Sequence, residues 1–447
     1  MSCTEADRAW AEWFARQLEE QGYRIPVRTG DAPQSEVPEP ERTFAVKSAD
    51  WELPDPPAVS LIELGDLSPA AAELLAMLAW MAYAPVPVDL FVNHPGSLPA
   101  GLAVAARDPR SWAETVDTLA RLGFVRRTPT EVLIGHQLLL QSVRTCGPCR
   151  SVEVQTLLEA DVPSRIVATP ADWPRWQALL SHVLAVADHV ENDPARCAAE
   201  NSGWLVDRAA TYLQVRGRHA DAIHLFKRAL AIIEGVHGPG SLAAASTLNN
   251  LGESLFEQDL SAEAIPVLKR SLAIHERADG EQISVAINLD NLAKAYVGQR
   301  RHTEAIPLMA RAITIWEAAL GPDHPDLGVS LHNLASIHNQ TKRYDEAIPL
   351  LERALAIDVS AYGPDDVTVA TSLDALGMSL RGSGRLLESV SLFERALSIY
   401  DAVYPTGHRH VAICLRHLAG AFTDLGRHDD ARNATARARA IDDGAAS

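Results

Sequence analysis

The sequence predicts an almost wholly helical chain, in which an α-solenoid of stacked helix pairs follows a small domain of helices and a β-hairpin. Two observations support this fold class. A unit of about 42 residues recurs six times between residues 204 and 442, and every copy carries the same apolar pattern. Before these repeats, residues 58–145 alternate amphipathic helical stretches with two short runs rich in β-branched and apolar residues.

Each repeat has a small residue near the start of its second helix. These anchors follow one another at intervals of 41 or 42 residues, and they are Ala222, Ala264, Ala305, Ala347, Ser389 and Ala431. A large apolar residue follows four positions later, a small residue seven positions later and another apolar residue eight positions later, which places them on one face of a helix. The large residues four positions after the anchors are predicted core plugs: Leu268, Met309, Leu351 and Phe393. The motif L-x-x-L-[AG] marks the first helix of the repeats and is read at Leu248, Leu289, Leu331 and Leu373, so each repeat is predicted to be two antiparallel helices.

These residues resemble the tetratricopeptide repeat, in which small residues let the two helices pack closely. The period of 42 and the connection Gly321-Pro322-Asp323-His324-Pro325 resemble the kinesin-light-chain variety of that repeat. We expect Gly321 to end its helix in a left-handed conformation and Pro325 to begin the next helix. The last helix has Thr435 at the plug position and is rich in arginine, which predicts a C-terminal cap.

Repeats of this kind stack into a groove lined by their first helices. Three repeats place an asparagine at the same position, and an amide both donates and accepts hydrogen bonds, so it can pair with an extended peptide backbone. The resemblance to kinesin-light-chain repeats implies the same use. We predict a protein or peptide ligand bound by Asn249, Asn250, Asn291, Asn333, Arg208 and His417. The alternative is that the amides bridge neighbouring helices or bind only water.

The chain begins with a predicted amphipathic helix within residues 1–30, followed by a linker at residues 31–57 that contains six prolines and many acidic residues. The amino-acid sequence from Thr4 to Trp13 and from Gly22 to Ile25 is similar to part of a bacterial TIR domain. The match covers about 25 residues and lacks the helix with the catalytic glutamate. No NAD cleavage is therefore expected, and a helix that only docks on a neighbour is the alternative.

Residues 58–145 are predicted to contain helices at 67–82, after Val88 and at 108–122, then a hairpin at 123–134. Three helices and a hairpin are the plan of a winged-helix domain. The segments Leu67–Leu75, Pro87–Phe91 and Gly135–Gln141 resemble the winged helix of bacterial STAND proteins of the NB-ARC type. Residues 146–203 resemble the helical connector that leads into the repeats of that family.

That family binds a nucleotide, and the resemblance implies that His136 stands where a histidine touches its phosphates. No G-x-x-x-x-G-K-[ST] loop occurs in this sequence, so no nucleotide or other cofactor is predicted, and we expect His136 to be a packed or surface residue. Cys146 and Cys149 form a C-x-x-C motif. The flanking residues typical of a thioredoxin site are missing, and so are the two further ligands that a zinc site would need. A structural turn is expected there, and no metal site.

Composition limits the partners. The formal net charge of -18 disfavours nucleic acid, and the predicted third helix of the small domain carries Glu114 and Asp117, which would oppose DNA phosphates. No apolar run is long enough to span a membrane, and five scattered cysteines favour a reducing compartment, so a cytoplasmic location is expected. The sequence contains no catalytic motif and leaves the oligomeric state open.

The function predicted from the sequence is a non-catalytic adaptor or sensor, derived from a STAND-type signalling protein without its nucleotidase. The alternative is a winged-helix transcription regulator that responds to a peptide bound by the repeats.

Overall fold

The chain folds as two units, Met1–Leu205 and Val206–Ser447. The computed structural model describes residues 67–134, 143–144, 148–163, 166, 170–192, 202–278, 282–404 and 408–444. The predicted N-terminal helix and the acidic linker lie outside the described residues, as do His136 and Cys146.

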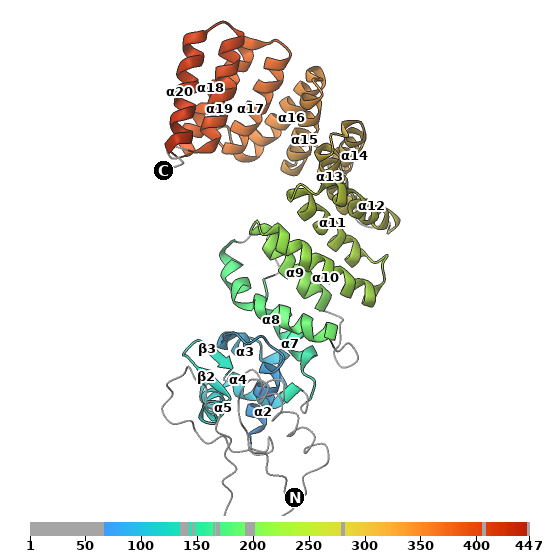
Figure 1. The fold of residues 1–447 in the computed structure, drawn as a ribbon, viewed down its shortest axis with the longest axis vertical. Coiled ribbons are helices and arrows are strands. Elements are labelled where there is room, and N and C mark those ends of the chain that lie inside the picture. The colour runs from blue at the N-terminus through green and yellow to red at the C-terminus, as the bar shows by residue number, and fades with distance from the viewer. Residues whose placement is uncertain are drawn as a thin grey trace, which may run out of the picture. The chain divides into compact units, whose positions relative to one another are not determined.

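The first unit combines helices with one small sheet (Figure 1). Its elements are α2 (Pro69–Leu78), β1 (Val86–Pro87), α3 (Val88–Val92), η2 (Pro95–Ser97), α4 (Ala100–Arg107), α5 (Pro109–Arg121), β2 (Val125–Arg127), β3 (Glu131–Ile134), α7 (Ser151–Asp161), η3 (Pro170–Asp172) and α8 (Trp173–Asn192). The predicted helices and hairpin are present at nearly the expected positions. The first helix is shorter than predicted, because it ends at Leu78 and not at Ala82.

Helix α4 and strand β1 were not predicted from the sequence. Helix α4 consists mostly of small residues, which give a weak periodic signal, and it packs against α2. Its first turn is completed from a distance, since the backbone N–H of Leu102 donates to Oε2 of Glu73 at 2.7 Å. Strand β1 is only two residues long, and it pairs antiparallel with β3, which also pairs with β2, in the order β1-β3-β2.

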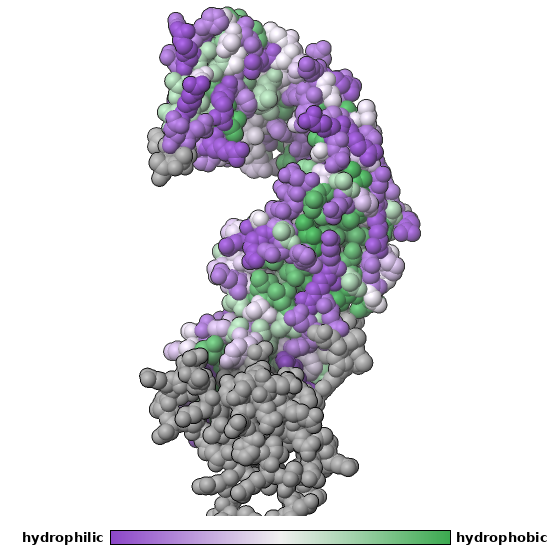
Figure 2. Space-filling model, viewed as in Figure 1, coloured by the Kyte–Doolittle hydropathy of each residue, from purple (hydrophilic) through white to green (hydrophobic). Residues whose placement is uncertain are grey.

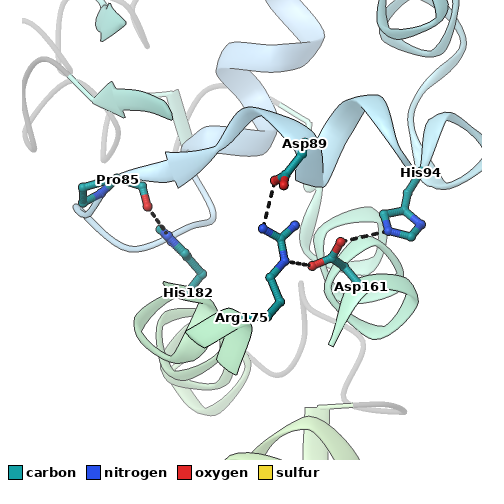
Figure 3. A network of polar contacts seen from close by, with 6 residues as sticks. All are labelled: Pro85, Asp89, His94, Asp161, Arg175 and His182. Carbon is teal, nitrogen blue, oxygen red and sulfur yellow. Dashed lines mark hydrogen bonds and ion pairs between the residues drawn. The ribbon is translucent and has the colours of Figure 1, made fainter. Parts of the chain in front are cut away.

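An ion-pair network holds α7 and α8 against α3 (Figure 3). Arg175 of α8 contacts the carboxylate of Asp161 in α7 and donates through Nη1 to Oδ1 of Asp89 in α3 at 2.8 Å. His94 lies 2.9 Å from the other oxygen of Asp161. The Asp161 side chain is only 7% exposed, so its two partners supply the compensation that a buried carboxylate needs.

His182 of α8 makes a second connection to the small domain (Figure 3). Its Nδ1 accepts from the backbone N–H of Ala82 at 3.2 Å, which leaves Nε2–H to donate to the carbonyl of Pro85 at 3.0 Å. The ring is fully buried, and burial lowers the pKa of His182 below its usual value. The neutral ring with its proton on Nε2 therefore satisfies both backbone groups.

The second unit, with the helix that leads into it, is a stack of six helix pairs (Figure 1). The pairs are α9 (Ser202–Val215) with α10 (His219–His237), α11 (Leu242–Glu257) with α12 (Ser261–Arg277), α13 (Gln282–Gly298) with α14 (His302–Leu320), α15 (Pro325–Gln340) with α16 (Tyr344–Tyr362), α17 (Val367–Gly382) with α18 (Leu386–Val403), and α19 (Arg409–Asp424) with α20 (His428–Gly444). From α10 to α20 each helix packs on the next, which confirms the predicted solenoid.

The predicted anchors and plugs form the core of this stack. Every anchor is buried and is the fourth residue of its helix. The small residue of the L-x-x-L-[AG] motif faces the plug of the same pair. A Cβ on Gly377 would lie 2.7 Å from the Phe393 ring, and one on Gly252 would lie 2.4 Å from Cγ of Leu268. Small residues are therefore required where the two helices of a pair cross.

Glycine ends three second helices, but not in the predicted left-handed helical conformation. Gly321 has φ 93° and ψ 164°, and Gly238 and Gly363 have similar angles. This combination lies in an extended region with positive φ that is essentially restricted to glycine. The expectation for Pro325 is confirmed, since it is the first residue of α15 and follows the N-cap His324.

First helices and second helices occupy different sides of the stack. Helices α11, α15 and α17 approach the first helix of the following pair, whereas the second helices of neighbouring pairs pack together less closely. This difference curves the stack and places the first helices on its inner side (Figure 1).

Candidate functional site

The candidate site is the inner face, which we define as the exposed surface of the first helices α11, α13, α15, α17 and α19. Five of the six residues predicted to contact a peptide lie on these helices, and Arg208 lies at the corresponding position of α9. The structure separates them into residues that bond to a neighbouring residue of the solenoid and residues that do not.

Two predicted ligand-binding amides bond to each other. Nδ2 of Asn291 in α13 donates to Oδ1 of Asn249 in α11 at 3.2 Å, and both side chains are buried. This contact links the first helices of two neighbouring pairs. Asn249 and Asn291 therefore form a bridge between helices, which was the alternative that the sequence left open.

Asn250 and Asn333 differ from that pair. Both are half-buried on the inner face, and neither side-chain amide has a hydrogen-bond partner among the residues that the structure describes. Each offers one acceptor and two donor hydrogens. These two amides are free to pair with a ligand.

Near the two ends of the solenoid the amide position holds Arg208 or His417, and each of these side chains contacts an aspartate. Arg208 donates through Nη2 to Oδ2 of the adjacent Asp207 at 2.6 Å. Nδ1 of His417 in α19 lies 2.9 and 3.0 Å from the two carboxylate oxygens of Asp374 in α17. Both predicted site residues are thus held by carboxylates of the solenoid itself.

A recurring carboxylate contact escaped the sequence analysis. The residue before the amide position is aspartate in alternate repeats, at Asp207, Asp290 and Asp374. Asp207 accepts from Oγ1 of Thr247 at 2.8 Å, and Asp290 accepts from Oγ of Ser330 at 2.8 Å. Each of these bonds reaches the first helix of the next pair. The signal was available as an aspartate that recurs every second repeat.

Burial shifts the pKa values of two side chains on the first helices. Desolvation raises the pKa of Asp290 above its usual value, although Trp316 and Ser330 both donate to its Oδ2 and lower the shift. Its Oδ1 is buried without a hydrogen-bond partner in the described part of the chain. Desolvation likewise lowers the pKa of His332, whose Nε2 has no partner among the described residues.

Exposed aliphatic side chains form a second feature that the sequence analysis missed. We define the aliphatic row as Leu242, Ile283, Ile287 and Val329, which are 48%, 39%, 40% and 60% exposed. They lie near the start of α11, α13 and α15 at two repeat positions, one shared by Leu242 and Ile283 and the other by Ile287 and Val329. Figure 2 shows hydrophobic residues gathered over the part of the solenoid around α11. Ile287 and Val329 lie one helical turn before the amide positions of Asn291 and Asn333, and Leu242 and Ile283 lie two turns before those of Asn250 and Asn291.

Neither a metal-binding cluster nor a membrane-spanning helix occurs in the part of the chain that the structure describes. No group of three or more His, Cys, Asp or Glu side chains in the described ranges is placed to hold a metal ion. Over the same residues, no helix combines the length and apolar character needed to cross a bilayer.

The family follows from comparison of the sequence with family models. The model described as "Tetratricopeptide repeat" matches residues 202–277, 284–360, 328–402 and 368–443, which together make up just over half of the chain. The chain therefore belongs to the tetratricopeptide repeat family. A search of curated proteins gave no significant match.

Solved structures with similar repeats include a kinesin light chain with nearly identical TPR-like repeats from Podosopora anserina, at 23% identity and a TM-score of 0.41, over 45% of this chain and 96% of that one. BtubC (BKLC) from P. vanneervenii gives 15% identity and a TM-score of 0.44, over 52% and 91%. MamA from Desulfovibrio magneticus RS-1 gives 17% identity and a TM-score of 0.35, over 45% and 97%.

Proposed function

We propose that the chain is a non-catalytic adaptor or sensor that binds a protein or peptide along the inner face of its repeats. Tetratricopeptide repeats are typical of protein interaction adaptors. The observation that carries the proposal is the pair of unpartnered, half-buried amides of Asn250 and Asn333. A ligand backbone can satisfy both the donor and the acceptor of each amide whatever its side chains are.

The test is selection from a random peptide display library against the purified full chain, followed by affinity measurement on the selected peptides. Asn250→Ala with Asn333→Ala should weaken binding at least tenfold, because two hydrogen bonds are lost, while the helical content stays unchanged. Leu387→Ala on the outer helix α18 is the matched control, and it should bind like the wild type. Selected peptides that bind the double variant as tightly as the wild type would refute the proposal.

We further propose that the chain derives from a STAND-type signalling protein without its nucleotidase, and that it acts in the cytoplasm. The resemblance of residues 54–144 to the winged helix of that family supports the first part. Both cysteines in the described part of the chain, Cys149 and Cys414, are free thiols, which agrees with a reducing compartment.

The alternative is a winged-helix transcription regulator, and one observation favours it. The strand order β1-β3-β2, with α5 directly before the hairpin, is the order expected of a winged helix. Against DNA binding, α5 exposes Glu114, and Asp117 forms an ion pair with Arg127 at 2.9 Å. A gel-shift assay at low salt with random-sequence duplex separates the two proposals, since the regulator retards DNA and the adaptor does not.

A further inference from the structure

We infer that the inner face of α11, α13 and α15 selects an extended peptide with aliphatic side chains along one edge and basic side chains where it passes α11. This inference rests on the proposed function and specifies the chemistry of its ligand. Three rows of residues on these helices support it: an aliphatic row, the amides, and a row that carries charge.

The first two rows are the aliphatic row and the amides. An extended chain that pairs its backbone with Asn250 and Asn333 runs across α11, α13 and α15. Neighbouring helices pack about 8–10 Å apart, so about six extended residues span the three helices. Alternate side chains of such a strand point to opposite edges, and one set then lies over Ile287 and Val329, with Leu242 one turn further out. Burial of those exposed aliphatic side chains favours aliphatic residues in the ligand.

The third row carries charge. One turn beyond the amide positions lie Glu253 in α11, Lys294 in α13 and Ser336 in α15, and Glu257 follows Glu253 by one more turn. Neither Glu253 nor Glu257 has an ion-pair partner in the described part of the chain. Lys294 acts on the buried Asp290, whose pKa it lowers in part. Helix α11 contains no basic residue, so its end of the face is acidic.

At the other end of the inner face, the charged side chains are paired with one another. On α17 and α19, Arg381 pairs with Asp424, Arg416 pairs with Asp442, and His417 pairs with Asp374. Their charges are internally compensated. The two free carboxylates on α11 are therefore the strongest uncompensated charge near the amides, and they select a basic side chain.

The experiment measures binding of fluorescein-labelled synthetic octapeptides by anisotropy. The first peptide has valine at alternate positions, serine between them and two lysines at one end. In the second peptide glutamates replace the lysines, and in the third serines replace the valines. The lysine–valine peptide should bind about tenfold tighter than either of the others at low salt, and the gap to the glutamate peptide should shrink at 0.5 M salt.

Matched variants assign the two effects. Ile287→Ser with Val329→Ser should weaken both valine peptides about tenfold. Glu253→Gln with Glu257→Gln should abolish only the preference for lysine over glutamate. Leu387→Ser and Glu394→Gln, both on the outer face of α18, should change neither. Equal or tighter binding of the glutamate peptide would overturn the inference, and so would inner-face variants that behave like these controls.

Failure of the inference can be told apart from failure of the proposed function. Library-selected peptides that need Asn250 and Asn333 but lack the aliphatic and basic pattern would refute the inference alone. A library that yields no peptide sensitive to those amides would refute both. Concentration-dependent self-association that the Ile287→Ser and Val329→Ser changes abolish would identify a second copy as the occupant, and it would also overturn the inference.

Discussion

Two stretches of the same inner face are built from equivalent positions and differ in how those positions are used. On α11 and α15, Asn250 and Asn333 have no partner among the described residues, and exposed aliphatic side chains lie one or two turns away. On α17 and α19, Ala375 and His417 occupy the amide positions, and His417 is held by Asp374. The first stretch keeps hydrogen-bonding capacity for a ligand, and the second uses it to hold neighbouring repeats together.

The largest expected effect comes from a substitution that destabilises only the second of these two stretches. Phe393→Ala removes a fully buried ring that packs against Gly377, and should cost about 3–5 kcal/mol. Because each repeat contacts only its neighbours, the loss should concentrate in α17–α20. Hydrogen exchange should show faster exchange there and unchanged protection in α11–α13, with unchanged affinity for a library-selected peptide. Uniform loss of protection would contradict this picture.

The amides themselves should separate function from stability. Asn291→Ala leaves the buried Oδ1 of Asn249 without its donor and should destabilise the fold by about 1–3 kcal/mol. Asn250→Ala breaks no bond and should change stability by less than about 0.5 kcal/mol. Urea denaturation of both variants checks the difference, and equal destabilisation would remove the distinction between bridging and free amides.

The residue before the amide position is Asn249 in α11 and His332 in α15. The histidine should make the stability of the fold depend on pH. Burial lowers the pKa of His332, whereas an unfolded histidine titrates near 6.5. As the pH falls through 6.5, the unfolded chain takes up the proton first, so stability decreases. Asp358 and Asp374 act on this ring and limit the effect.

The His332→Asn variant copies the residue of α11 and should lose less stability than the wild type between pH 7 and pH 5, by up to about 1 kcal/mol. Urea midpoints at the two pH values measure this difference. Parallel pH profiles would mean that His332 does not contribute.

The smallest effect concerns the turns within the helix pairs. Corresponding turn residues have positive φ in every pair, and three of them are not glycine: Asp259, Arg300 and Lys342. Left-handed conformation costs such residues roughly 1 kcal/mol. Lys342→Gly should therefore raise stability by up to about 1 kcal/mol, while Gly384→Ala at the equivalent turn should lower it by a similar amount. Thermal unfolding of both variants measures the two changes in stability, and changes of the same sign would contradict the prediction.

The sequence predicts the repeats better than it predicts the small domain. The anchors recur at a fixed interval and every one is buried, because helix crossings tolerate only small residues there. Helix α4 lacked such a signal, since its alanines give little contrast between faces, and a two-residue strand such as β1 has no periodicity. The left-handed cap expected at Gly321 was wrong in its ψ angle, which depends on where the next helix begins.

The site was predictable only as a set of positions. The period placed Asn250, Asn291 and Asn333 on equivalent turns of successive helices. Which amides are free depends on neighbours about 42 residues away, as the bonds from Asn291 to Asn249 and from His417 to Asp374 illustrate. The aliphatic row was missed because isoleucine and valine at helical spacing usually indicate core, and only the packed structure reveals their exposure.

The most direct test is photo-crosslinking of a library-selected peptide to the full chain. A photoreactive phenylalanine analogue is placed either at Val329 on the inner face or at Leu387 on the outer helix α18, where the native side chains are 60% and 72% exposed. The account predicts a peptide adduct from position 329 that excess unlabelled peptide suppresses, and none from position 387. Equal adducts from both positions, or an adduct from position 387 alone, would contradict it.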